Sequence, residues 1–113
     1  MAKLDPALDL AFAALSDPTR RRILERLARG PATVSEMHAA HDMSLPSFTA
    51  HLKKLEGAGL ITSEKTGRVR SCALSPGAFA PVQDWLAEQR ALWQGRLDRF
   101  DTYVTQLSEE RKP

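Results

Sequence analysis

Residues 33–57 read TVSEMHAAHDMSLPSFTAHLKKLEG, a segment with the pattern of two helices joined by a tight turn. Thr33 and Glu36 match a capping box, in which a threonine hydroxyl and a glutamate satisfy free amides where a helix begins. The box predicts a short helix over residues 34–41, and Asp42-Met43-Ser44 is predicted to form a turn after it.

A second helix follows the turn. Ser44 is a favourable N-cap, and Pro46 is tolerated in the first turn of the helix. The apolar side chains recur at spacings of three, four and three, which predicts a single buried stripe; they are Leu45, Phe48, Leu52 and Leu55. Gly57 and Gly59 end the pattern. A short helix, a tight turn and an amphipathic helix together form a helix-turn-helix.

Two helices are predicted ahead of this unit. Each begins with an aspartate at the N-cap and a proline at the first helical position, at Asp5-Pro6 and at Asp17-Pro18. The apolar residues of the first helix are Leu8, Phe12 and Leu15, and those of the second are Ile23, Leu24 and Leu27. Arg20, Arg21 and Arg22 are expected on the other faces of the second helix, either against phosphates or simply exposed.

The period changes after the helix-turn-helix. Residues 60–65 and 68–74 flank Thr66-Gly67 and predict a β-hairpin, and residues 77–107 are again helical. The predicted fold is mainly α with a small β-hairpin wing, a winged helix-turn-helix in the order α-α-α-α-β-β-α. All 113 residues, 1–113, form one predicted domain.

Composition narrows the possible functions. A single cysteine excludes an internal disulfide framework and a cysteine-only zinc cage, and no apolar run approaches the length of a membrane span. The N-terminus does not have the pattern of a secretory signal, so a cytoplasmic protein is expected. The net charge is +2, but residues 18–75 hold ten basic and five acidic side chains. This local excess favours an anionic partner.

The second helix of the helix-turn-helix can enter a major groove of DNA, because a groove about 12 Å wide admits one helix. Hydroxyl and imidazole groups can read base edges, which predicts readout by Ser47, Thr49 and His51. Lysines neutralise phosphates. The predicted contact residues of this helix are Ser44, Ser47, Thr49, Ala50, His51, Lys53 and Lys54.

Three segments resemble the ArsR family of bacterial winged-helix repressors: DPTRRRIL at residues 17–24, MSLPSFTAHLKKL at 43–55 and AGLI at 58–61. The resemblance extends from about residue 8 to residue 107. It implies a homodimer that binds double-stranded operator DNA and represses transcription. It also implies that residues 44–57 form the recognition helix.

The resemblance further places Arg68 and Arg70 in the wing, where they are expected to meet phosphates. It implies that the first helix (about 5–15) and the last (about 77–107) build the dimer interface. A helix about 30 residues long extends about 45 Å, more than a monomeric winged-helix core could cover. The predicted interface residues are Leu8, Phe12, Leu15, Leu86, Trp93, Leu97, Phe100 and Val104.

The chain departs from the metal-sensing members of that family. Residues 36–41 contain no Cys-x-Cys pair, and residues 76–113 contain no histidine. No metal or other cofactor is expected. His38 and His41 are predicted to be surface or half-buried histidines, and Cys72 is predicted to be a structural thiol. A phosphate-binding glycine loop, a nucleophile elbow and an HExxH motif are all missing from the sequence, so no enzyme is expected.

Two alternatives stay open. The same surface could serve a winged-helix module that binds another protein. The repressor could also be gated by an unidentified small-molecule, metal or redox effector, with His38 and His41 or Cys72 as sensing groups. The basic excess of residues 18–75 favours DNA over a protein partner.

Overall fold

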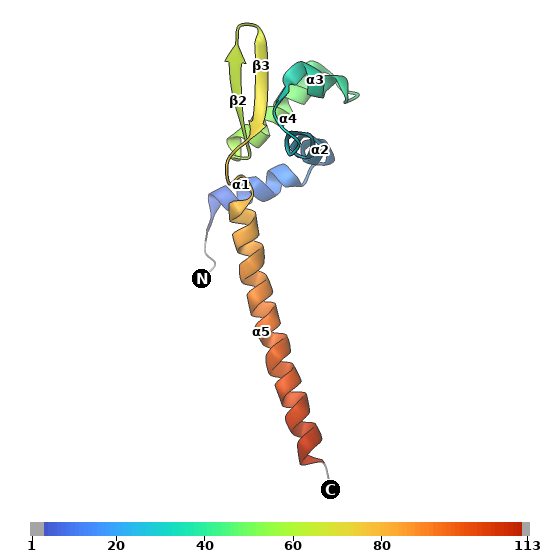
Figure 1. Ribbon diagram of the computed structural model, residues 1–113, viewed down its shortest axis with the longest axis vertical. Coiled ribbons are helices and arrows are strands. Elements are labelled where there is room, and N and C mark those ends of the chain that lie inside the picture. Colours follow the sequence, from blue (N-terminus) through green and yellow to red (C-terminus); the bar gives the residue numbers. More distant parts are fainter. Residues whose placement is uncertain (1–3, 112–113) are drawn as a thin grey trace. The chain divides into compact units, whose positions relative to one another are not determined.

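The computed structural model describes residues 4–111, which form five helices and three strands (Figure 1). The helices are α1 (Pro6–Leu15), α2 (Pro18–Leu27), α3 (Val34–Ala39), α4 (Leu45–Gly57) and α5 (Ala80–Glu110). The strands are β1 (Ala32–Thr33), β2 (Ile61–Thr66) and β3 (Val69–Leu74). The predicted fold class, mainly helical with a hairpin wing, is confirmed. The chain divides between Val82 and Gln83 into two compact units, the second of which is most of α5.

Local capping chemistry starts four of the helices. In each, the side chain before the first helical residue accepts a hydrogen bond from the amide three residues later; these caps are Asp5 (3.1 Å), Asp17 (3.0 Å), Thr33 (3.1 Å) and Ser44 (3.3 Å). The predicted starts of α1 to α4 are therefore confirmed. The ends differ slightly, because α3 stops at Ala39 and α5 runs from Ala80 to Glu110.

The strands form an antiparallel sheet in the order β1-β3-β2. Thr66 pairs with Val69, which leaves Gly67 and Arg68 as the turn of the hairpin. The predicted turn, Thr66-Gly67, is thus wrong by one residue. A two-residue hairpin turn favours a glycine with positive φ at its first position, and Gly67 has φ +63°. The short strand β1, which pairs Ala32 with Cys72, was not predicted.

A single core lies inside the first unit. Helices α1 to α4, the sheet and the loop before β2 contribute its buried members: Ala14, Ile23, Leu24, Leu27, Ala32, Met37, Phe48, Leu52, Leu55, Leu60, Ile61 and Cys72. Phe48 is the largest of the fully buried side chains, at 0% exposure. No helix within residues 4–111 is both long enough and apolar enough to cross a membrane.

The stripe predicted for α4 is wrong at its first position. Leu45 is 50% exposed, whereas Phe48, Leu52 and Leu55 are buried. Leu45 is the first residue of α4, and periodicity gives the face of a residue but not how far along the helix its neighbours reach. The core contact of α4 therefore begins one turn later, at Phe48.

Candidate nucleic-acid interface

The outward face of α4 carries a small set of polar and basic side chains. Ser47, Ala50, Lys53 and Lys54 are exposed. Successive helical residues are rotated by about 100°, so Thr49 and His51 fall on either side of Ala50. Thr49 and His51 are half-buried. The predicted contact residues thus form an exposed central strip with one half-buried polar residue on each flank.

The first of these residues are already ordered by hydrogen bonds to one another. The Ser44 hydroxyl accepts from the amide of Ser47 at 3.3 Å and donates to the Ser47 hydroxyl at 3.0 Å. Both side chains are exposed. Ser44 therefore has a structural role as the cap, and Ser47 keeps acceptor capacity toward solvent.

The wing is connected to the end of α4 by a chain of polar side chains. Arg70 Nη1 donates to the Ser63 hydroxyl at 3.1 Å, and this hydroxyl donates to Glu56 Oε1 at 2.9 Å. Arg68 lies in the hairpin turn itself, and both arginines are exposed. These contacts hold Arg70 of the wing beside α4, in the first unit.

A groove of about 510 Å³ separates α4 from the wing and the start of α3. Thr49, Lys53, Arg68 and Arg70 line it, together with apolar side chains such as Leu45 and Val69. Val69 is 52% exposed and was not among the predicted site residues. The groove therefore combines cations with exposed apolar groups, and apolar side chains in a major groove contact thymine methyl groups.

One of the two predictions placed Arg20 on an exposed face of α2, and this prediction is wrong. Arg20 is 8% exposed, and its guanidinium donates from Nε to the Ala14 carbonyl at 2.8 Å and from Nη2 to the Ala13 carbonyl at 3.0 Å. The last carbonyls of a helix have no partner inside the helix. Arg20 therefore caps the C-terminal end of α1. No local sequence pattern predicts this contact, because it joins two helices.

The third guanidinium nitrogen of Arg20 reaches α4. Arg20 Nη1 lies 3.1 Å from His51 Nδ1, and Asp17 Oδ2 lies 3.7 Å from the same nitrogen. A hydrogen bond from the backbone amide of Arg20 holds the pKa of Asp17 below its ordinary value, and the positive charge of the Arg20 side chain acts in the same direction. Asp17, Arg20 and His51 thus form one polar cluster at the junction of α1, α2 and α4.

This cluster makes folding sensitive to acid. The folded protein lowers the pKa of Asp17 from 3.8, so the stability that its carboxylate contributes is present above that value and is lost as pH falls through the lowered pKa. Asp17→Ala is expected to lower the free energy of unfolding by about 1 kcal/mol at pH 7. Chemical denaturation across pH checks this, and the deficit should shrink below about pH 4. Asp42→Ala, which removes an exposed carboxyl from the turn, is the control. A deficit of the same size at low pH would contradict the role of the charge.

The histidines of α3 and the loop after it pack on the core. His38 Nε2 donates to the Met43 carbonyl at 2.8 Å, and the rings of His38 and His41 lie 5.6 Å and 5.2 Å from the Phe48 ring. Burial, and then the charge of Arg22, holds the pKa of His41 below its ordinary value. Within residues 4–111, no three histidine, cysteine, aspartate or glutamate side chains gather as they would around a metal ion.

Cys72 lies on the central strand of the sheet and is 1% exposed. Burial, and then the charge of Glu56, raises the pKa of its thiol. The reactive form of cysteine is the thiolate, so a buried group with a raised pKa is a poor nucleophile.

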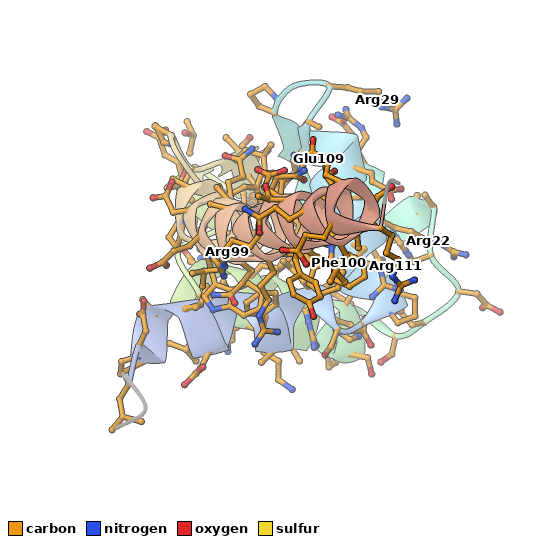
Figure 2. The ribbon with its side chains drawn as sticks, turned by 90° about the horizontal axis from the view of Figure 1, so that it is seen from below. Arg22, Arg29, Arg99, Phe100, Glu109 and Arg111 are labelled. Atoms are coloured by element: carbon orange, nitrogen blue, oxygen red, sulfur yellow. The ribbon has the colours of Figure 1, made fainter. Side chains whose placement is uncertain are left out.

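The second unit carries a series of exposed apolar side chains on α5. The predicted interface residues Leu86, Trp93, Leu97, Phe100 and Val104 are all exposed, and Figure 2 shows Phe100 and its neighbour Arg99 projecting from the helix. Leu92 and Tyr103 are exposed as well, and they were not among the predicted interface residues. Both lie on the helix about 80–100° from the row of Trp93, so they widen the apolar face.

The predicted interface residues of α1 are placed differently. Ala11 and Ala14 face the core, whereas Leu8 and Leu15 are half-buried and Phe12 is 38% exposed. Leu15 packs against the core cluster. Leu10, which the prediction left out, is exposed. The exposed large apolar side chains of α1 are therefore Leu10 and Phe12, which lie on different sides of the helix, about 160° apart.

The chain is similar in sequence and structure to known helix-turn-helix regulators. A family described as a helix-turn-helix domain matches residues 15–64. The HTH-type transcriptional regulator Rv2034 of Mycobacterium tuberculosis is 40% identical over 75 residues, which cover 66% of this chain and 70% of that protein. The transcriptional repressor SdpR of Bacillus subtilis is 32% identical over 75 residues, which cover 66% of this chain and 83% of that protein. A crystal structure of an ArsR family transcriptional regulator is 52% identical, with a TM-score of 0.78, and the match covers 83% of this chain and 97% of that one.

Proposed function

The chain belongs to the ArsR family of winged helix-turn-helix transcriptional regulators, and from this membership we propose that it binds a palindromic operator in double-stranded DNA as a homodimer and represses transcription. The observation that supports this most is the position of the wing beside the recognition helix. Glu56, Ser63 and Arg70 connect the two elements, so the cations of both can meet one DNA backbone.

The division of roles follows the exposure of the side chains. Ser47 and Ala50 are exposed near the start of α4, and this part of a recognition helix contacts base edges. Thr49 lies beside them and lines the groove between α4 and the wing. Lys53 and Lys54 lie further along the helix, and with Arg68 and Arg70 they supply contacts to phosphates. Phosphate contacts position the protein and base contacts carry the sequence information.

We propose that exposed apolar side chains of α1 and α5 form the interface of the homodimer. A twofold dimer presents two recognition helices to successive major grooves, with centres about 34 Å apart on a palindromic site. Repression then results from exclusion of the polymerase from the occupied operator. The relative from Bacillus subtilis is named as a repressor.

A protein-binding winged helix is the competing proposal. The net charge of +5 over residues 18–75 supports DNA, because a polyanion attracts such a surface. Selection of genomic fragments by the purified protein, followed by titration of the selected and scrambled duplexes at one salt concentration, tests the proposal. We expect the selected duplex to bind at least about 1,000-fold more tightly. Equal affinity for both duplexes would contradict a sequence-specific regulator.

The contribution of the wing to DNA affinity can be measured from the salt dependence of binding. Each phosphate contact by a cation contributes about 0.9 to the slope of log affinity against log salt concentration. Changing Arg68 and Arg70 together to Ala is expected to weaken binding to every duplex and to reduce that slope by up to about 3.6, because each of the two subunits loses two contacts. The matched control is the pair Arg99→Ala and Arg111→Ala, which removes the same charge from the C-terminal part of the chain. A wild-type slope in the wing variant would show that Arg68 and Arg70 do not contact phosphates.

A further inference from the structure

Arg20 is a buried cation with an unusual set of partners. Its three nitrogens contact two carbonyl oxygens of α1 and one ring nitrogen of α4, at 2.8 Å, 3.0 Å and 3.1 Å. Among residues 4–111, no carboxylate oxygen lies within 4.0 Å of its guanidinium. The carbonyls at the end of α1 are the negative end of a helix dipole, which stabilises the cation without neutralising it as an ion pair would.

This contact fixes the protonation of His51. A guanidinium has only donors, so the ring nitrogen that faces it must accept, and Nδ1 of His51 is therefore the unprotonated nitrogen. A neutral imidazole with a free Nδ1 carries its proton on Nε2. Asp17 Oδ2, at 3.7 Å from Nδ1, is beyond hydrogen-bonding distance. His51 is thus held as a donor at Nε2, with a positive charge behind its ring.

The position of His51 on α4 decides what that donor meets. His51 lies about 100° around the helix from Ala50, on one flank of the outward face. Ser47 and Lys54, which are exposed, lie about one turn before and after it. When a helix lies in a major groove, its central strip faces the bases and its flanks face the walls of the groove, which carry the phosphates.

We propose, on the basis of the proposed DNA-binding function, that Arg20 is a positioning residue that holds His51 as a neutral Nε2–H donor to a backbone phosphate of bound DNA. The sequence alone predicts base readout by His51. The Arg20 contact and the flank position instead give it a contact that is independent of base sequence. Arg20 also caps α1, so the same guanidinium orients α1 and the recognition helix.

Two near-isosteric substitutions separate the two ring nitrogens. The amide nitrogen of glutamine reaches the position of Nε2, whereas that of asparagine reaches only the position of Nδ1. His51→Gln is therefore expected to keep affinity within about threefold of wild type. His51→Asn is expected to lose about tenfold per subunit, and therefore about 100-fold for the homodimer, equally on the selected and scrambled duplexes, because each subunit loses a hydrogen bond to a charged group. Thermal melts of each variant confirm folding.

The tautomer is observed directly on the full-length wild-type protein by long-range ¹H–¹⁵N NMR of the histidine rings. We expect His51 to show an unprotonated Nδ1 and a protonated Nε2. In Arg20→Met the ring is expected to become a mixture of tautomers and DNA affinity to fall about as in His51→Asn. The double variant should bind no more weakly than either single variant, because both changes remove one interaction. If Arg20→Met does not fold, the wild-type spectrum and the two His51 variants carry the test.

The outcomes separate this inference from the proposed function. If wild-type protein binds the selected duplex but His51→Asn binds equally well, the phosphate contact is overturned and the function stands. A loss confined to the selected duplex identifies base readout and also overturns it. Equal losses in His51→Gln and His51→Asn, or a protonated Nδ1 in the wild-type spectrum, overturn the role of Arg20. Failure of the wild-type protein to bind any duplex overturns both proposals.

Discussion

Leu97→Asp is expected to separate the homodimer and, with it, to abolish tight operator binding. An aspartate at an interface must be desolvated without a partner, and a large apolar contact is lost in the same change. Losses of about 2–4 kcal/mol are typical of central interface residues and correspond to a rise of about 30- to 1,000-fold in the dimer dissociation constant. Sedimentation across micromolar concentrations, with and without the selected duplex, measures this.

The second unit is one helix, and none of its described side chains is buried. A helix of 31 residues is about 46 Å long, and a lone helix has no second element against which to bury an apolar face. Contiguous exposed apolar surface of this kind marks an association site in soluble proteins.

The apolar residues fall into two adjacent rows on α5. One row contains Leu86, Trp93, Leu97, Phe100 and Val104, and the other includes Leu92 and Tyr103. At about 100° per residue, the two rows together occupy somewhat less than half of the helix circumference. Aromatic residues dominate the binding energy of many interfaces, and Trp93, Phe100 and Tyr103 are spread over three turns here.

A matched control is available on the same helix. Thr105 is exposed and lies at least about 80° around the helix from every residue of the two rows. Thr105→Asp adds the same charge outside the apolar rows and is expected to leave the dimer and the operator affinity unchanged. The loss of binding in Leu97→Asp comes from valency, because a monomer contacts only one half-site. Wild-type protein that sediments as a monomer at micromolar concentration would contradict the dimer and the palindromic operator together.

The parts of this structure that the sequence predicts well are those governed by chemistry within a few residues. Asp5, Asp17, Thr33 and Ser44 cap helices because each side chain reaches an amide three residues later in its own segment. That geometry needs no other part of the chain. The starts of α1 to α4 could therefore be predicted, and with them the helix-turn-helix.

The parts that could not be predicted depend on contacts between segments. The burial of Arg20 requires carbonyls of α1 and a ring of α4 to converge on one guanidinium, and the sequence around Arg20 is that of an exposed arginine cluster. β1 is only two residues long, so it has no alternation to detect, and it exists because β3 offers Cys72 and Ser71 as partners. The exposed Leu45 and Val69 likewise depend on where neighbouring elements stop.

Phe48→Ala is expected to have the largest effect on stability of any single core substitution in the first unit. The ring is 0% exposed, and the rings of His38 and His41 lie 5.6 Å and 5.2 Å from it, so it joins α4 to the α3 segment of the helix-turn-helix. Truncation of a buried phenylalanine costs about 3–5 kcal/mol through lost transfer energy and the cavity left behind. This cost is a large share of the free energy of unfolding of a small domain, which is about 5–15 kcal/mol.

Leu45→Ala is the matched control, because periodicity assigns Leu45 and Phe48 to the same stripe while the structure exposes half of Leu45. We expect Leu45→Ala to cost less than about 1 kcal/mol, and Phe48→Ala to lower the melting temperature by at least about 10 °C. Both are measured at one protein concentration, since an oligomer gains stability with concentration. Leu45 lines the groove beside the wing, so its substitution should instead weaken DNA binding. Equal destabilisation by the two changes would mean that α4 packs against the core along the whole predicted stripe. Leu45 would then be buried in the core and would not line the groove between α4 and the wing.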